Sequence, residues 1–120
     1  MTHILAVDDS PSMREMVRIA LTGAGFDVTQ AADGEEALQI ARQTSFDLVL
    51  SDVNMPRMDG ISLIRALRAE NAYRHTPILM LTTEGSVDRK RQGKEAGATG
   101  WIVKPFDPDL LVATMQRVLR

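Results

Sequence analysis

The sequence predicts an α/β fold in which helices cover both faces of a parallel sheet. Short apolar runs alternate along the chain with segments whose apolar residues recur every three or four positions. This alternation is typical of a parallel sheet with a helix between successive strands. Four of the runs contain almost only apolar residues, as strands buried on both faces do, and they cover residues 4–7, 48–50, 78–81 and 101–103.

The first half of the chain carries recognisable starts and ends of elements. Ser10-Pro11 predicts a helix with a side-chain cap and proline at its first position, ending near Gly25. We expect the buried face of this helix to consist of Met13, Met16, Val17, Ala20, Leu21 and Ala24. Residues 27–31 alternate polar and apolar, which indicates a half-exposed edge strand. The second helix opens at residues 33–36, where three carboxylates are expected to act as caps.

The second half of the chain contains three more predicted helices. The third includes Ile61, Ile64, Leu67 and Arg68 and ends before the polar stretch that leads to Pro77. The fourth, about residues 86–96, has few apolar residues and an interior Gly93, which costs about 1 kcal/mol against alanine. Its basic residues, Arg89, Lys90, Arg91 and Lys94, form either a solvated face or a mobile surface for a partner. The fifth runs from about residue 108 to the end, with positions 111, 115, 118 and 119 facing inward.

The composition sets limits on the class of protein. A chain of 120 residues is expected to form one domain, residues 1–120. It has no cysteine, which excludes disulfides, zinc–thiolate sites and thiol catalysis. A net charge of −2 provides no general attraction to nucleic acid or to anionic membranes. Because no apolar run approaches the roughly 20 residues of a membrane span and the first strand leaves no room for a signal peptide, we expect a cytoplasmic protein without membrane insertion.

Polar residues follow the buried strands at the point where each strand ends. Asp8 and Asp9 directly follow the first apolar run. Asp52 follows the second run, with Ser51 between them. Thr82 and Lys104 follow the last two runs. The carboxyl ends of parallel strands meet at one edge of the sheet, where ligands bind in open α/β folds. The sequence therefore predicts that three carboxylates, two hydroxyls (Thr82 and Thr83) and an ammonium group gather there.

The chemistry of this group suits a divalent cation and a phosphoryl group. Carboxylates brought together repel each other unless a cation lies among them. Oxygen ligands without histidine or cysteine favour a hard ion, and Mg²⁺ with several retained waters is the expected one. Lys104 after a buried strand favours a point-charge contact with phosphate over an ordinary surface position. Thr82 is either a β-branched strand residue or a hydroxyl donor to a phosphate oxygen.

Four segments in this order resemble the receiver domain of bacterial two-component response regulators, of the CheY-like single-domain type. They are VDDS at 7–10, SDVNMPRMDG at 51–60, LTTE at 81–84 and GWIVKPF at 100–106. The resemblance covers essentially the whole chain. It implies the doubly wound (βα)5 flavodoxin-like fold, with five parallel strands in the order 2-1-3-4-5.

The resemblance also implies a role for each matching residue. Asp52 is similar to the phosphoacceptor, which takes a phosphoryl group from a phosphohistidine on a sensor histidine kinase. Asp9, Asp52 and the backbone carbonyl of Asn54 resemble the direct Mg²⁺ ligands, with Asp8 acting through water. Thr82 and Lys104 resemble the phosphate-binding pair.

Four further positions are implied to assist or report the reaction. Lys104-Pro105 is similar to the family's cis peptide, for which proline lowers the penalty to about 0.5–1 kcal/mol. Trp101 stands where the family carries an aromatic switch residue that acts with Thr82. Asn54 and Glu84 stand where side chains flank the path of attacking water and tune dephosphorylation.

The expected function is that of a stand-alone response regulator that signals in chemotaxis through phosphorylation-dependent protein binding. Expected partners are a sensor histidine kinase, a downstream target such as the flagellar motor switch, and a phosphatase. We expect a monomer that catalyses only its own phosphotransfer and autodephosphorylation. Because the chain ends at the fifth helix, we expect no DNA-binding or enzymatic domain. The basic fourth helix and Trp101 depart from the family pattern on the target-binding surface, so a particular target does not transfer.

Several alternatives remain open at the level of sequence. Within the same class the chain could be a phosphorelay intermediate or a phosphate sink. A different class is an aspartyl-phosphate phosphohydrolase, but that enzyme usually places a second aspartate two residues after its nucleophile, where this chain has Asn54. An FMN protein of the same fold is disfavoured because Asp8 and Asp9 would repel its phosphate. A receiver that is never phosphorylated is disfavoured because every chemical position is filled.

Overall fold

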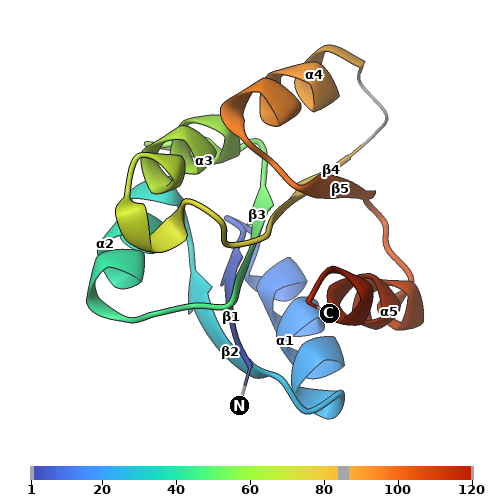
Figure 1. Ribbon diagram of the computed structural model, residues 1–120. Coiled ribbons are helices and arrows are strands. Elements are labelled where there is room, and N and C mark those ends of the chain that lie inside the picture. Colours follow the sequence, from blue (N-terminus) through green and yellow to red (C-terminus); the bar gives the residue numbers. More distant parts are fainter. Residues whose placement is uncertain (1, 84–86, 120) are drawn as a thin grey trace.

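The computed structural model describes residues 2–83 and 87–119, and its centre is a five-stranded parallel sheet (Figure 1). The strand order is β2-β1-β3-β4-β5, and neighbouring strands are paired in parallel. The strands are β1 (His3–Val7), β2 (Asp27–Ala31), β3 (Leu48–Asp52), β4 (Ile78–Thr82) and β5 (Gly100–Val103). Both the α/β class and the expected order are confirmed.

Helices cover the two faces of the sheet. They are α1 (Pro11–Gly23), α2 (Gly34–Gln43), α3 (Gly60–Arg68), α4 (Val87–Ala96) and α5 (Pro108–Val118), with a short 3₁₀ helix η1 (Asn71–Tyr73). In Figure 1, α1 and α5 lie on one side of the sheet and α2, α3 and α4 on the other. Within the described ranges, every helix is too short or too polar to span a membrane.

The core consists of two apolar layers separated by the sheet. Leu5, Val49 and Met80 belong to the layer under α2, α3 and α4. Leu50 and Leu81 belong to the layer under α1 and α5. Successive residues of a strand point to opposite faces, so a central strand with helices on both sides must be apolar at every position. This requirement explains the continuous apolar runs in β1, β3 and β4.

The two edge strands differ from the central ones. The prediction of a half-exposed edge strand at 27–31 is confirmed, because β2 pairs only with β1 and is buried only at its last residue. The prediction that residues 101–103 are buried on both faces is wrong. The side chains of Trp101 and Val103 are 43% and 42% exposed, and only Ile102 between them is buried. The reason is position, since β5 is the other edge of the sheet.

The first helix packs through a narrower stripe than the one predicted. Val17 and Leu21 are fully buried, and Met13 and Ala20 pack against them in part. Met16 was expected on this face but is 49% exposed, since the helix meets the core through the neighbouring Val17. Such an exposed methionine needs no special explanation.

The fourth helix lies close to the sheet and buries little. Two of its ten residues, Gly93 and Ala96, are buried. A Cβ atom at Gly93 would stand 2.2 Å from the sulfur of Met80 and 2.3 Å from its methyl carbon. The interior glycine therefore allows α4 to lie close to β4, and a side chain at this position would have to displace the end of Met80 or move α4.

Candidate functional site

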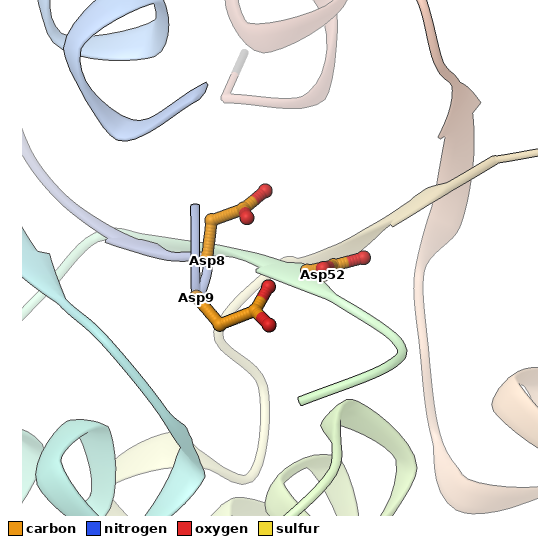
Figure 2. A group of neighbouring side chains, drawn as sticks. All are labelled: Asp8, Asp9 and Asp52. Atoms are coloured by element: carbon orange, nitrogen blue, oxygen red, sulfur yellow. The ribbon is translucent and has the colours of Figure 1, made fainter. Parts of the chain in front are cut away.

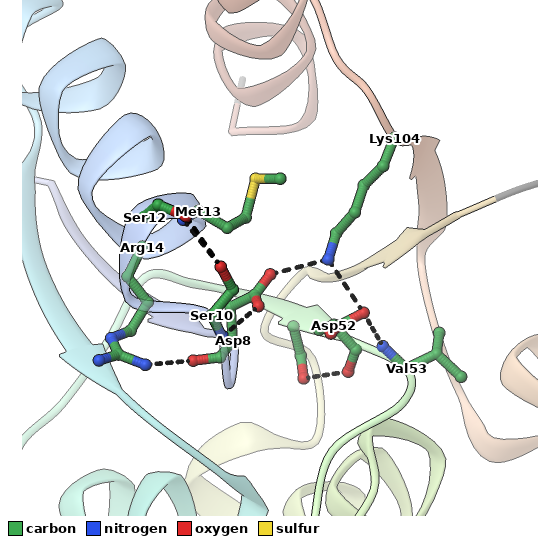
Figure 3. Close-up of polar contacts among 9 residues, drawn as sticks. Asp8, Ser10, Ser12, Met13, Arg14, Asp52, Val53 and Lys104 are labelled. Carbon is green, nitrogen blue, oxygen red and sulfur yellow. Dashed lines mark hydrogen bonds and ion pairs between the residues drawn. The ribbon is translucent and has the colours of Figure 1, made fainter.

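The structure brings four of the predicted side chains to the carboxyl edge of the sheet. Asp52 and Thr82 are the last residues of β3 and β4 and are both buried. Asp8 follows β1 and is also buried, and Lys104 follows β5. Figure 3 shows Lys104 extending toward Asp8 and Asp52 from the far side of the site.

Three carboxylates form an acidic cluster at this edge, which Figure 2 shows. One oxygen from each of Asp8, Asp9 and Asp52 lies within 4.8 Å of the others. Asp8 and Asp52 are buried, whereas Asp9 is exposed. The three side chains offer only oxygen donors, and the exposed Asp9 leaves room for water, which fits Mg²⁺ with several retained waters. The fold therefore brings the three predicted carboxylates together, and their donor set suits the expected ion.

Lys104 acts as a counterion within the cluster. Its Nζ lies 2.9 Å from Asp8 Oδ2 and 3.2 Å from Asp52 Oδ1. Burial alone would lower the pKa of Lys104, but the hydrogen bond to Asp8 and the charges of Asp52 and Asp8 outweigh it, and the pKa is raised. Lys104 is therefore held in its charged form.

The electrostatic environment of Asp52 opposes its ionised form. Burial is the largest cause of its raised pKa, and repulsion from Asp8 is the second. Two neighbours act in the opposite direction but do not reverse the rise in pKa. Lys104 contributes its charge and a hydrogen bond, and the amide of Val53 donates a hydrogen bond of 2.8 Å to Asp52 Oδ1. An added cation at this site would favour the ionised carboxylate.

Asp8 is fixed by contacts that the sequence does not reveal. Its Oδ1 accepts a hydrogen bond of 2.9 Å from the backbone N–H of Ser10. Its backbone carbonyl accepts one of 2.6 Å from Arg14 Nη1 on α1 (Figure 3). A side chain that binds a carbonyl six residues earlier has no sequence signature, so this role of Arg14 was not predicted.

The remaining predicted site residues are dispersed around the cluster. Asn54 is exposed, and its Oδ1 accepts a hydrogen bond of 3.2 Å from Arg89 Nη2 on α4. The peptide bond between Lys104 and Pro105 is cis. Glu84 lies outside the described residues. The contacts of Asn54 therefore connect the loop after the acidic cluster to α4.

Trp101 lies on the α4 side of β5 and is not part of the acidic cluster. Lys90 Nζ lies 4.8 Å from the centroid of its ring, within the range of a cation–π interaction. A hollow of about 330 Å³ opens beside the ring, lined by Val87, Lys90, Arg91, Lys94 and Trp101. The residues that depart from the family pattern therefore meet in one place on the surface.

Comparisons with known proteins agree with this fold. Residues 4–116 match the family model of the response regulator receiver domain. The solved structure of the chemotaxis protein CheY4 from Vibrio cholerae is 54% identical, with a TM-score of 0.95, and the match covers 98% of each chain. The chain belongs to the response regulator receiver domain family.

Other relatives extend the comparison in two directions. One solved structure is the receiver domain of the sensor histidine kinase PA1611 from Pseudomonas aeruginosa PAO1, which has a magnesium ion coordinated in its active-site cleft. It is 31% identical, with a TM-score of 0.92, and the match covers 98% of this chain and 97% of that one. The DNA-binding dual master transcriptional regulator RpaA from Synechocystis is 38% identical over the whole chain. The chain spans 50% of that protein's length, and about half the length of several other curated relatives that it matches.

Proposed function

We propose that this protein is a response regulator whose Asp52 accepts a phosphoryl group from a sensor histidine kinase. The observation that supports the proposal best is the position of Asp52 at the end of β3, beside Asp8 and Asp9 and 3.2 Å from the Lys104 ammonium. An Asp52 oxygen attacks the phosphorus, the bond from phosphorus to the histidine nitrogen breaks, and the imidazole leaves with that electron pair. Apart from this step and its own dephosphorylation, the protein carries out no catalysis.

The neighbouring residues have separate tasks in this proposal. Lys104 binds a phosphoryl oxygen as a point charge, and the hydroxyl of Thr82 donates to another. The carboxylates of Asp8, Asp9 and Asp52, with the backbone carbonyl of Asn54, hold Mg²⁺. When bound, Mg²⁺ neutralises negative charge between the acceptor and the phosphoryl group.

The proposed output is phosphorylation-dependent protein binding in chemotaxis, in the cytoplasm. The support is the similarity to CheY4, which extends over 98% of both chains. A sensor kinase, a target such as the flagellar motor switch, and a phosphatase are the proposed partners. The surface around Trp101 and Lys90, with its hollow, is the proposed contact region for the target.

A mass measurement tests the phosphoacceptor. Incubation with acetyl phosphate and Mg²⁺ should add one phosphoryl group to the intact protein, and Asp52→Asn should abolish the addition. Asp27→Asn is the matched control, because Asp27 begins β2 and lies at the opposite end of the sheet. An unchanged yield in Asp52→Asn would show that another residue is the acceptor.

A capture experiment tests the output. The protein is immobilised with Mg²⁺, with and without beryllofluoride as a phosphoryl mimic, and exposed to lysate of its source organism. Recovery of a flagellar motor component only with beryllofluoride supports the chemotaxis proposal. Recovery only of histidine-containing phosphotransfer proteins would instead favour a phosphorelay intermediate.

A further inference from the structure

The loop that follows the phosphoacceptor contains an unusual turn at Arg57. The amide of Met58 donates a hydrogen bond of 2.7 Å to the carbonyl of Pro56, which closes a three-residue turn with Arg57 at its centre. The φ angle of Arg57 is +64°. A residue with a Cβ atom rarely adopts this left-handed region, and such a conformation persists only where surrounding contacts enforce it.

The side chain of Arg57 forms an ion pair with a buried carboxylate. Arg57 Nη2 contacts Asp33 Oδ2, and Arg57 Nε lies 3.7 Å from Glu35 Oε2. The Asp33 side chain is only 2% exposed, whereas that of Arg57 is 63% exposed. The other oxygen of Asp33 caps α2 by accepting a hydrogen bond of 2.9 Å from the amide of Glu36. The pKa of Asp33 is lowered, mainly by the hydrogen bond from the Glu36 amide and also by Arg57. The carboxylate is therefore held ionised.

A backbone contact beside the ion pair holds the same turn. The amide of Gly34 donates a hydrogen bond of 3.1 Å to the carbonyl of Met58. A Cβ atom at Gly34 would stand 2.5 Å from that oxygen, so glycine permits the close approach. Asp33 and Gly34, at the start of α2, thus contact Arg57 and Met58 of the loop.

The ion pair has no evident task in stabilising the fold alone. Asp33 caps α2 through its other oxygen, and because the Arg57 end of the pair is 63% exposed, solvent screens much of the attraction. Glycine at position 57 would relieve the backbone strain, yet the chain carries arginine there. The guanidinium, rather than the backbone, is therefore what this position supplies.

We propose that the Arg57–Asp33 ion pair positions the metal-binding loop. It fixes one end of the loop to α2, while the contact of Asn54 with Arg89 fixes the other end to α4. The backbone between Asn54 and Arg57 is thereby held from both ends, which would limit the positions open to the carbonyl of Asn54. Arg57 is a positioning residue that acts through the backbone. The inference rests on the proposed function, because the Mg²⁺ site and the ligand role of Asn54 belong to it.

Calorimetric titration of the full chain with Mg²⁺ tests the inference. Arg57→Ala and Arg57→Gly should each raise the dissociation constant about three- to tenfold, below the 10- to 100-fold effect of partners that touch a metal ligand directly. Arg57→Lys, which keeps the charge, should recover part of the affinity. Arg42→Ala is the matched control, because Arg42 forms an exposed ion pair with Glu70 away from the site. The Mg²⁺ dissociation constant of this variant should stay within twofold of that of the unmodified chain.

Two comparisons separate positioning from a general loss of stability. Arg57→Gly relieves the backbone strain, so without metal it should unfold at a higher temperature than Arg57→Ala while binding Mg²⁺ equally weakly. In the Asp33→Asn background, which keeps the oxygen that caps α2, Arg57→Ala should cause no further loss of affinity. Additive losses would overturn the proposal, as would Arg57 variants that bind Mg²⁺ within twofold of the unmodified chain. If the unmodified chain did not bind Mg²⁺, the proposed function itself would fail.

Discussion

Replacing Asp52 with asparagine should stabilise the metal-free protein and weaken its stabilisation by Mg²⁺. The reason is the environment of the carboxylate, since burial and then repulsion from Asp8 raise the pKa of Asp52. Asparagine keeps the shape of the side chain and can still accept the hydrogen bond from the amide of Val53, but it carries no charge.

The magnitude follows from the distances around Asp52. At an effective dielectric constant of about 20, an oxygen of Asp8 within 4.8 Å costs at least about 3.5 kcal/mol. The Lys104 ammonium at 3.2 Å returns about 5 kcal/mol in the same treatment. Because these pairwise energies largely cancel, the lost hydration of Asp52 decides the sign. We therefore expect the substitution to stabilise the metal-free protein, by an amount at the lower end of the roughly 0.5–3 kcal/mol by which single substitutions usually change stability.

Thermal unfolding in a chelator and in excess Mg²⁺ measures both effects. About 1 kcal/mol corresponds to roughly 2–8 °C for domains of this size range. Mg²⁺ at a hundred times its dissociation constant should stabilise the unmodified protein by about 2.7 kcal/mol and the variant by less. The metal-free difference should vanish below the ordinary pKa of 3.8 and grow as the pH rises, because the raised folded-state pKa makes the unfolded chain ionise first.

Asp27→Asn serves as the control, since Asp27 is exposed at the amino end of β2. It should change neither the metal-free melting temperature nor the response to Mg²⁺ by more than the error of the assay. A metal-free Asp52→Asn that melted at or below the unmodified protein at neutral pH would refute the electrostatic reasoning. Equal stabilisation of both proteins by Mg²⁺ would refute the metal site.

The remaining predictions concern the reaction, the switch and the packing of α4. Asn54→Ala combined with Glu84→Ala should change the decay rate of the phosphorylated protein, because both positions flank the expected water path, and an unchanged decay would remove this role. Trp101 is the sole tryptophan, so its emission or acrylamide quenching should change when beryllofluoride follows Mg²⁺, and an unaltered signal would rule out a rotating aromatic switch. Gly93→Ala should destabilise the fold by about 1 kcal/mol in urea unfolding. Overpacking against Met80 costs about 1–3 kcal/mol, which outweighs the gain of about 1 kcal/mol from the higher helix propensity of alanine. A stabilised variant would show that Met80 repacks without cost.

The sequence predicts the acidic cluster well because its position depends on topology alone. Asp8, Asp52 and Lys104 each stand at or just beyond the end of a strand, and parallel strands bring those ends together whatever the side-chain details. Strand order came from the family resemblance, and the structure confirms it. This part of the prediction needed only the apolar runs and the residues that follow them.

Other features depend on tertiary contacts that leave no local pattern. Three apolar residues in succession look the same in a central strand and in an edge strand, so the apolar run alone predicts burial where Trp101 and Val103 are exposed. Only the family resemblance placed Trp101 on the surface. The left-handed turn at Arg57 gives no signal either, because glycine or asparagine usually marks such a conformation. Its partner Asp33 was correctly expected to cap a helix. The sequence does not distinguish an aspartate that only caps a helix from one that also forms an ion pair through its second oxygen.

The free edge of β5 limits how another chain can join this sheet. An exposed strand edge presents unpaired amide and carbonyl groups on which a second strand can grow. Here the edge is only four residues long, and Pro105, which has no N–H to donate, follows shortly after it. Strand addition would therefore gain few hydrogen bonds. The exposed side chains of Trp101 and Val103 are therefore the larger part of what this edge offers for contact.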